Sequence, residues 1–334
     1  MLRNLTVTIV VAAMTLYVAS AGTAAVGGPP VLKYYARGAY CDAICVGKVL
    51  DTQIGDVRSN EWADYQMTFR VDRVLRGDVA PGSTVTVTYG QQVGYPRYFL
   101  SGYDLLLLKK QGDQLSMALS SFSSVPVSEK TYSVYTKTDD VERNLRWEML
   151  NSLASSSPEV ISAALGQYRL LAHPEAVPVL KKYACSSDAS DRAMAVSALV
   201  LAGEQDFIPA AMAFALKCYS LPVGSASMSG LQAVLVLQEV GVPAKYVPDV
   251  GRLLASPNKD VRVFAATVLR SSKTDDTIPY PGTGLSDPDQ AVRYPAVMGL
   301  AERTKDYPNG PAIYIYQANE EKYLDYWKKK MAAQ

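Results

Sequence analysis

The chain has 334 residues, 49% hydrophobic and 19% charged, a composition that allows a sizeable buried core and excludes disorder of the whole chain. Its 33 lysines and arginines nearly balance its 32 aspartates and glutamates, which leaves a formal charge of +1. This balance excludes the broad basic field on which non-specific nucleic-acid binding depends, so we expect no nucleic-acid partner.

Residues 1–25 form the first recognisable segment of the chain. Arg3 is their only charged residue, an uncharged stretch follows from Asn4 to Ala25, and small residues offer cleavage sites after Ala21 or Ala25. This is the form of a secretory signal peptide and predicts export to the periplasm or the extracellular space. An uncleaved membrane anchor is the alternative, although the polar residues within the stretch make it a weak spanning helix. After cleavage we expect no stable membrane insertion.

Residues 31–127 carry a strand-like pattern. Short runs of alternating or continuous apolar residues are separated by segments rich in turn formers, such as 76–82; the runs are 43–50, 65–74, 83–89, 104–109 and 115–119. The run at 104–109 is continuously apolar at 105–108, which indicates a strand covered on both faces. These runs predict about five antiparallel strands that form a small β-barrel or a sandwich, and we choose the antiparallel barrel on the resemblance described next.

Three segments of this region, 43–49, 69–77 and 82–87, resemble the OB-type barrel of the tissue inhibitors of metalloproteinases and of netrin modules. In the inhibitor family, a cysteine at the mature amino terminus chelates the zinc of the target enzyme. Neither predicted cleavage site exposes a cysteine here, so the resemblance implies the fold and not zinc-protease inhibition. Barrels of this type also bind nucleic acids through aromatic side chains, but the tyrosines of this region are ordinary half-buried strand residues.

A polar connector, residues 128–138, leads to a helical region that we predict over 139–334. Asp139 and Asp140 cap a helix that reaches Leu150, and Ser157 precedes a helix that reaches Leu171. Helical hairpins follow at 174–185 with 188–202, 206–218 with 228–240, 245–255 with 258–271, and 278–285 with 289–304. A final helix over 314–330 is expected to cover the last hairpin.

One spacing recurs in these hairpins. An apolar residue followed by proline precedes an arginine by fourteen residues, counted from the proline, in three hairpins: Pro178 with Arg192, Pro248 with Arg262, and Pro279 with Arg293. These positions resemble the HEAT family, which implies an α-solenoid of stacked helical hairpins. We expect the arginines to bind carboxylates or carbonyls between neighbouring repeats; an anion-binding ladder is the alternative.

The second hairpin departs from this pattern. Gly230 stands where the arginine is expected, and about seven extra residues, 221–227, lengthen the loop before it. The extra residues are either a harmless lengthening of the loop or an insertion that takes part in binding.

The four cysteines include one candidate pair. Cys185 and Cys218 lie near the ends of the first helices of consecutive hairpins, where a disulfide is possible if the helix ends converge. The alternative is two buried thiols that pack as small hydrophobic side chains.

The sequence has few residues that could form a catalytic or metal-binding site. The single histidine, His173, precedes a proline and is therefore expected in a turn, and a zinc site or a catalytic triad cannot be assembled around it. Three acidic pairs, at 139/140, 275/276 and 287/289, stand at predicted helix starts and cap backbone N–H groups; calcium binding is the alternative. We expect no catalytic residues, no metal and no cofactor.

These patterns predict an exported, non-catalytic binding or scaffold protein that recognises a protein or peptide on the solenoid surface. One alternative is an extracytoplasmic enzyme with carboxylate chemistry in the interdomain cleft. Another is an inhibitor that acts through the barrel loops.

Overall fold

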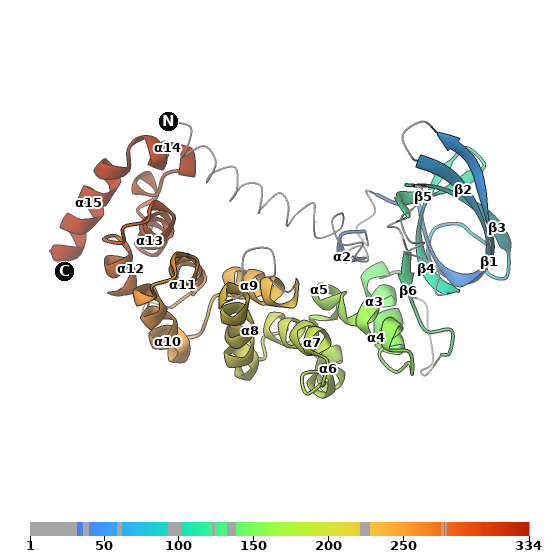
Figure 1. The fold of residues 1–334 in the computed structure, drawn as a ribbon, viewed down its shortest axis with the longest axis horizontal. Helices are drawn as coiled ribbons and strands as arrows, with labels where there is room; N and C mark the ends of the chain where they lie inside the picture. Colours follow the sequence, from blue (N-terminus) through green and yellow to red (C-terminus); the bar gives the residue numbers. More distant parts are fainter. Residues whose placement is uncertain are drawn as a thin grey trace. The chain divides into compact units, whose positions relative to one another are not determined.

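The computed structural model describes residues 32–35, 40–58, 62–92, 102–121, 124–131, 138–220, 228–274, 277 and 279–333. Contacts divide the chain into two compact units, Met1–Val179 and Leu180–Gln334. Strands occupy the first unit together with a few helices, and helices make up the second (Figure 1). The predicted signal peptide lies outside the described residues, and the predicted domain boundaries (31–127, 128–138 and 139–334) stay a prediction.

Five strands close into a barrel: β1 (Ala43–Arg58), β2 (Trp62–Arg76), β3 (Thr84–Gln92), β4 (Tyr103–Gln111) and β5 (Gln114–Ser121). Their order is β1-β2-β3-β5-β4, and a second pairing of β1 with β4 completes the ring. A short strand, β6 (Ser124–Pro126), pairs with residues 104–106 of β4, which also pair with β1. The five predicted strand runs correspond to these five strands, with only Ser83 of the run 83–89 outside β3, whereas the sequence did not predict β6.

The barrel is mixed, so the prediction of a purely antiparallel barrel was wrong. β3 pairs with β5 in parallel, through Val87 with Leu115 and Thr88 with Ser116, while the other pairs are antiparallel. Strand direction cannot alternate all the way around a closed ring of five members. At least one parallel pair is therefore required by closure itself, and the β3–β5 pair meets that requirement.

Apolar side chains of alternate residues fill the barrel. Met67, Phe69 and Val71 of β2 are fully buried, as the alternation of that segment predicts. In β4, residues 105–108 are all buried, although only Leu106 and Leu108 belong to the barrel cluster. This strand is thus covered on both faces, which confirms the interpretation of its continuous apolar run.

Three helices of the first unit follow the barrel: α3 (Val141–Ser152), α4 (Pro158–Leu165) and α5 (Tyr168–Leu171), after the short α2 (Leu32–Tyr35) near the start of the chain. Asp140 caps α3 by accepting a hydrogen bond from the backbone N–H of Arg143 at 3.1 Å, and Ser157 caps α4. The sequence predicted one helix from Ser157 to Leu171, but the chain forms two, with Gly166 and Gln167 between them.

The remaining helices begin with α6 (Val177–Tyr183), which spans the boundary between the units. They continue with α7 (Ala189–Leu201), α8 (Ile208–Ser220), α9 (Met228–Val240), α10 (Val247–Arg252), α11 (Lys259–Ser271), α12 (Pro279–Gly284), α13 (Gln290–Arg303), α14 (Ile313–Ala318) and α15 (Glu320–Ala332). A 3₁₀ turn precedes each of the helices α6, α8 and α10. The second residue of each of these three helices is a proline. The predicted final helix over 314–330 is divided in two at Asn319.

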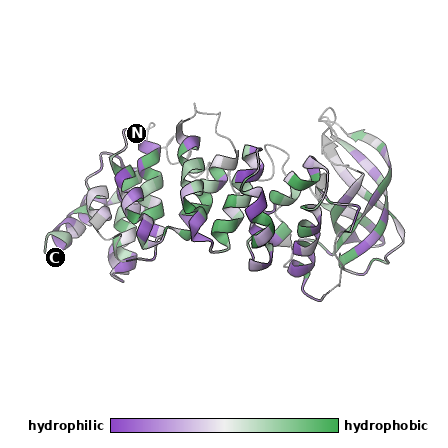
Figure 2. Cartoon of the chain, turned by 90° about the horizontal axis from the view of Figure 1, so that it is seen from below, coloured by the Kyte–Doolittle hydropathy of each residue, from purple (hydrophilic) through white to green (hydrophobic). Residues whose placement is uncertain are grey.

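In the second unit, the second helices of successive hairpins contact each other in chain order: α7 with α9, α9 with α11, and α11 with α13. These helices share a stripe that is buried throughout, with alanine at 195, 233, 265 and 296 and leucine four residues later at 199, 237, 269 and 300. Figure 2 shows that both hydrophobic and hydrophilic residues occur along the helices of this unit. Among the described residues, no helix has the length and apolar character needed to cross a bilayer.

Candidate functional site

The three repeated arginines share one contact. The Nη1 atom of each donates to the backbone carbonyl six residues earlier: Arg192 to Ser186, Arg262 to Ser256 at 3.0 Å, and Arg293 to Asp287 at 2.7 Å. The fourteen-residue spacing therefore corresponds to a repeated local geometry, in which each arginine holds the turn between the two helices of its hairpin. That contact satisfies carbonyls just before the second helix.

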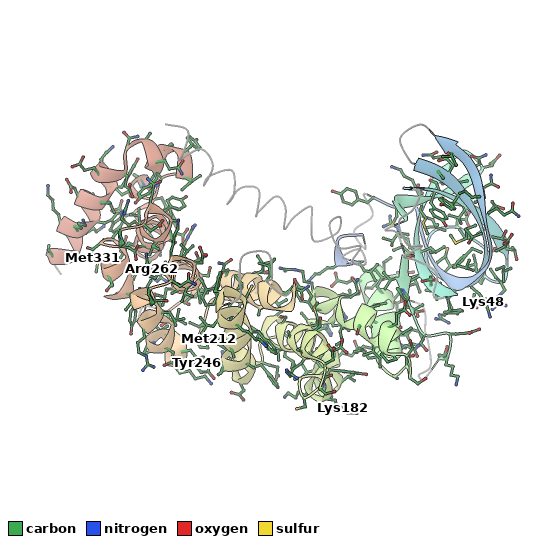
Figure 3. The ribbon with its side chains drawn as sticks, viewed as in Figure 1. Lys48, Lys182, Met212, Tyr246, Arg262 and Met331 are labelled. Carbon is green, nitrogen blue, oxygen red and sulfur yellow. The ribbon has the colours of Figure 1, made fainter. Side chains whose placement is uncertain are left out.

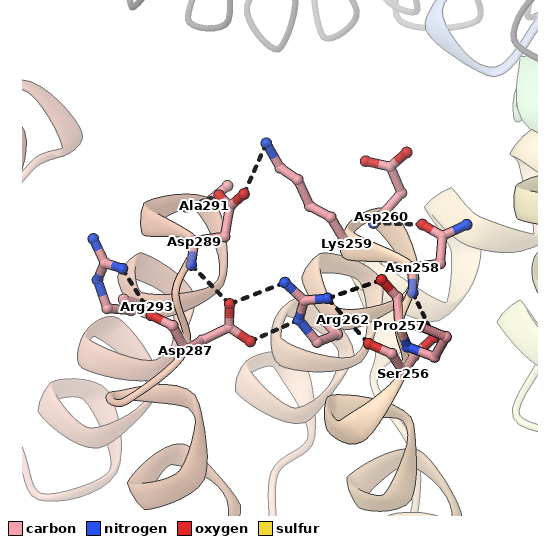
Figure 4. Close-up of polar contacts among 10 residues, drawn as sticks. All are labelled: Ser256, Pro257, Asn258, Lys259, Asp260, Arg262, Asp287, Asp289, Ala291 and Arg293. Atoms are coloured by element: carbon pink, nitrogen blue, oxygen red, sulfur yellow. Dashed lines mark hydrogen bonds and ion pairs between the residues drawn. The ribbon is translucent and has the colours of Figure 1, made fainter.

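Two of these arginines also bind a carboxylate farther along the chain, in the next hairpin for Arg262 and at the start of α15 for Arg293. Arg262, labelled in Figure 3, lies on α11. Its Nε and Nη2 atoms donate hydrogen bonds to the two carboxylate oxygens of Asp287, at 2.7 and 3.2 Å (Figure 4). Arg293 donates from Nε to Glu320 at 2.7 Å. The side chain of Arg262 is only 13% exposed and that of its partner Asp287 only 7%. The guanidinium of Arg262 is therefore not available to an anion from solution. These contacts favour the inter-repeat role over an anion ladder.

Replacing Arg262 with methionine is expected to lower the free energy of unfolding of the helical unit by about 2 kcal/mol, because Asp287 would lose a charged partner while remaining buried. Denaturation followed by far-UV circular dichroism measures the change. The matched control is Arg252→Met, which removes an ion pair with Asp249 from a side chain that is 77% exposed, where the expected cost is under 1 kcal/mol. Equal effects of the two substitutions would contradict the inter-repeat role.

The first and second hairpins differ from the other two. Arg192 has no carboxylate partner in the described residues; its guanidinium lies 5.7 Å from the ring centre of Phe214 on α8, a cation–π contact. At Gly230, which replaces the arginine, an added Cβ would lie 2.7 Å from the Cβ of Cys218. Close approach of α8 and α9 therefore explains why a long side chain is absent from this position. The extra loop, 221–227, lies outside the described residues.

The candidate disulfide between Cys185 and Cys218 is not formed in the structure, where both thiols are free. Cys185 is exposed, whereas Cys218 is buried against Gly230. Burial raises the pKa of the Cys218 thiol, so this side chain behaves as a small apolar residue rather than a nucleophile.

The other sequence-predicted polar residues have local structural contacts. His173 accepts a hydrogen bond at Nδ1 from the backbone N–H of Glu175 at 3.3 Å and caps a 3₁₀ turn, as expected of a turn histidine. Asp140 and Asp289 cap α3 and α13, which confirms the capping interpretation for these two. Residues 275 and 276 lie outside the described residues. Within the described part of the chain, no three histidine, cysteine or acidic side chains are grouped so as to hold a metal ion.

The sequence did not reveal a buried ion pair between the barrel and α3. Arg73 of β2 donates from Nε and Nη2 to the two carboxylate oxygens of Glu148, at 2.7 and 2.9 Å, and from Nη1 to the hydroxyl of Tyr103 at 3.1 Å. Glu148 is fully buried; burial raises the pKa of its carboxyl, and Arg73 acts against this. Burial also raises the pKa of Tyr103 to about 12. This cluster joins the barrel to the first helix after it.

A second polar cluster holds the carboxyl end of the described chain. Asp306 accepts hydrogen bonds from Lys330 Nζ at 2.8 Å, from Asn309 Nδ2 at 2.9 Å and from the hydroxyl of Tyr326. These bonds, the one from Lys330 foremost, lower the pKa of Asp306 to about 2. The carboxylate thus links the turn after α13 to α15.

The Asp306 cluster predicts a loss of stability in acid. The pKa of Asp306 is lower in the folded protein than its ordinary value of 3.8. The ionised carboxylate therefore stabilises the fold fully at a pH above this ordinary value, and the stabilisation is lost as the pH falls towards 2. We therefore expect Asp306→Asn to be less stable than the wild type at pH 6 and equally stable near pH 2. Urea denaturation across this range measures the difference, and Asp325→Asn on the exposed face of α15 is the control. A difference that does not change with pH would contradict the assignment.

Comparison of the chain with known protein families finds no match, and comparison with curated proteins finds no significant relative.

Proposed function

We propose that the chain is an exported, non-catalytic scaffold protein whose helical unit binds a protein or peptide. The proposal includes a more specific fold type for each of the two regions. The barrel is of the OB type, and the helical hairpins form a HEAT-type α-solenoid whose repeats present one continuous binding surface. Export rests on the signal-like segment at residues 1–25.

The barrel proposal is supported by topology. A closed ring of five strands in the order β1-β2-β3-β5-β4, with its parallel pair between β3 and β5, is the arrangement expected of an OB-type barrel. The three segments that resemble inhibitor and netrin barrels lie on β1, on β2 with the turn after it, and on the start of β3 with the turn before it.

The observation that carries the functional proposal is the serial contact of the second helices. The helices α7, α9, α11 and α13 contact in chain order. The ion pair Arg262–Asp287 joins one hairpin to the next, and the ion pair Arg293–Glu320 joins the last hairpin to α15. Repeats that contact only their neighbours make long surfaces rather than enclosed pockets, and such surfaces bind other proteins.

The contacts of the acidic residues favour binding over carboxylate catalysis. Asp140 and Asp289 cap helices, Asp287 is bound by Arg262, and Glu148 is closed off from solvent by Arg73. A catalytic carboxyl needs access to a substrate in addition to a shifted pKa. Each of these four side chains already has a structural partner.

Affinity capture from the extracytoplasmic fraction of the source cells tests the proposal. The full chain serves as bait, an unrelated exported protein of similar size is the control, and mass spectrometry identifies the proteins retained. We expect a protein enriched by the chain and not by the control, which then binds the purified chain with a measurable dissociation constant. Retention of the same proteins by both baits, or no binding after purification, would contradict the proposal.

A further inference from the structure

One end of the barrel contains a hollow with a cavity volume of about 420 Å³. Its walls come from the start of β1, from the connection between β2 and β3, and from the hairpin of β4 and β5. The apolar part of its lining includes Val79, Val85 and Leu115, three partly buried side chains that pack on the core of the barrel. The floor of the hollow is therefore apolar and is supported by the core of the barrel.

The rim of the hollow is acidic. Asp42, Asp78 and Asp113 line it together with one lysine, Lys110, and all four side chains are exposed. Asp42 accepts a hydrogen bond from the backbone N–H of Lys110 at 2.8 Å, which fixes its carboxylate at the rim. Asp78 and Asp113 have no side-chain partner among the described residues. Three carboxylates against one ammonium group give the rim an excess of two negative charges, on a chain whose total charge is close to zero.

The wall is held in place by backbone contacts. Gly77 has a φ of +88°, and a Cβ on it would lie 2.6 Å from the carbonyl oxygen of Asp42, so only glycine allows the β2–β3 connection to approach β1 this closely. Farther along this connection, the N–H of Gly82 donates to the carbonyl of Val71 at 2.7 Å, and Ser83 Oγ donates to the carbonyl of Ala80 at 2.6 Å. A site that is formed before its ligand arrives does not lose affinity to ordering.

We infer that this hollow, the barrel-end pocket, receives an arginine side chain from a peptide segment of a partner protein. The aliphatic stem of arginine fits the apolar floor, and its guanidinium can donate to carboxylates at the rim. An anionic ligand is disfavoured by the charge of the rim. The inference rests on the proposed function and goes beyond it, because it adds a contact of the partner with the barrel and names the chemistry of that contact.

The full chain carrying labelled valine and leucine methyl groups is titrated with the peptide Gly-Arg-Gly amide, and NMR follows the signals of Val79, Val85 and Leu115. The matched probe is the same peptide with citrulline, which has nearly the shape of arginine but no charge. We expect the three signals to shift with the arginine peptide and not with the citrulline peptide. The dissociation constant is expected to rise with salt, because exposed charges are screened.

Two sets of variants separate charge from shape. Asp78→Asn with Asp113→Asn should raise the dissociation constant at least tenfold, whereas Asp139→Asn with Asp325→Asn removes two exposed carboxylates elsewhere and should leave it unchanged. Ala80→Trp should abolish the shifts by filling the mouth while all rim carboxylates stay in place. Equal shifts with both peptides, or equal binding by the two double variants, would overturn the inference.

The same variants distinguish this inference from the proposed function. If the full chain captures a partner and Asp78→Asn with Asp113→Asn captures it equally well, the pocket inference fails and the proposed function stands. If the arginine peptide binds at the pocket but no partner is captured, the proposed function fails instead.

Discussion

Replacing Glu148 with alanine is expected to lower the free energy of unfolding of the first unit by about 3–5 kcal/mol, the usual cost of breaking a buried ion pair by removing one partner. The Arg73 side chain is only 15% exposed in the structure, and the substitution leaves its guanidinium with no opposite charge at Nε and Nη2. Tyr103 and the ring of Trp147, whose centre lies 5.9 Å from the guanidinium carbon, cannot neutralise it. Denaturation followed by tryptophan fluorescence measures the loss, since Trp62 and Trp147 belong to this unit.

Two further variants decide whether the effect comes from the charge. Glu159→Ala on α4 removes an exposed glutamate and should change stability by less than about 0.5 kcal/mol. Arg73→Met combined with Glu148→Leu replaces both charges by apolar side chains and should recover most of the loss, because no unpaired charge remains buried. A double variant as unstable as Glu148→Ala would show that shape, and not charge, controls this contact.

Local patterns in the sequence predicted the strands and helices of both units, because apolar periodicity and cap residues act over only a few neighbouring residues. Alternating or continuous apolar runs placed the five barrel strands, and the cap residues Asp140, Ser157 and Asp289 placed the starts of helices. The repeated arginines were predicted to bind carbonyls and carboxylates, and Arg262 binds both. A fixed spacing of fourteen residues carries this information because each arginine repeats the same short-range contact.

Features made by distant segments were not predicted. Arg73 and Glu148 are 75 residues apart, and neither stands in a pattern that marks it as buried. The barrel-end pocket is lined from three segments, which meet only when the barrel closes. The parallel β3–β5 pair follows from the number of strands in the ring, which no single strand reveals.

Trp327→Ala is expected to remove about 3–5 kcal/mol from the stability of the carboxyl-terminal helices, because it deletes a large, fully buried side chain. Trp327 packs in one cluster with Leu300 of α13 and with Tyr316 and Tyr323 of the last two helices. Its Nε1 also donates to the carbonyl of Asn309 at 2.8 Å, so the substitution leaves that acceptor without its partner. Trp327→Phe keeps most of the apolar volume and should cost much less.

The distribution of this loss along the chain tests the stacked arrangement itself. In a solenoid each repeat contacts only its neighbours, so a defect in the last layer should loosen α13–α15 and leave α7 and α9 protected. Hydrogen exchange followed by mass spectrometry should then show exchange at least about a hundredfold faster in α14 and α15, with no change in α7. A closed globular domain would lose protection throughout as one cooperative unit. Uniform loss would therefore contradict the solenoid, and with it the extended surface on which the proposed binding function depends.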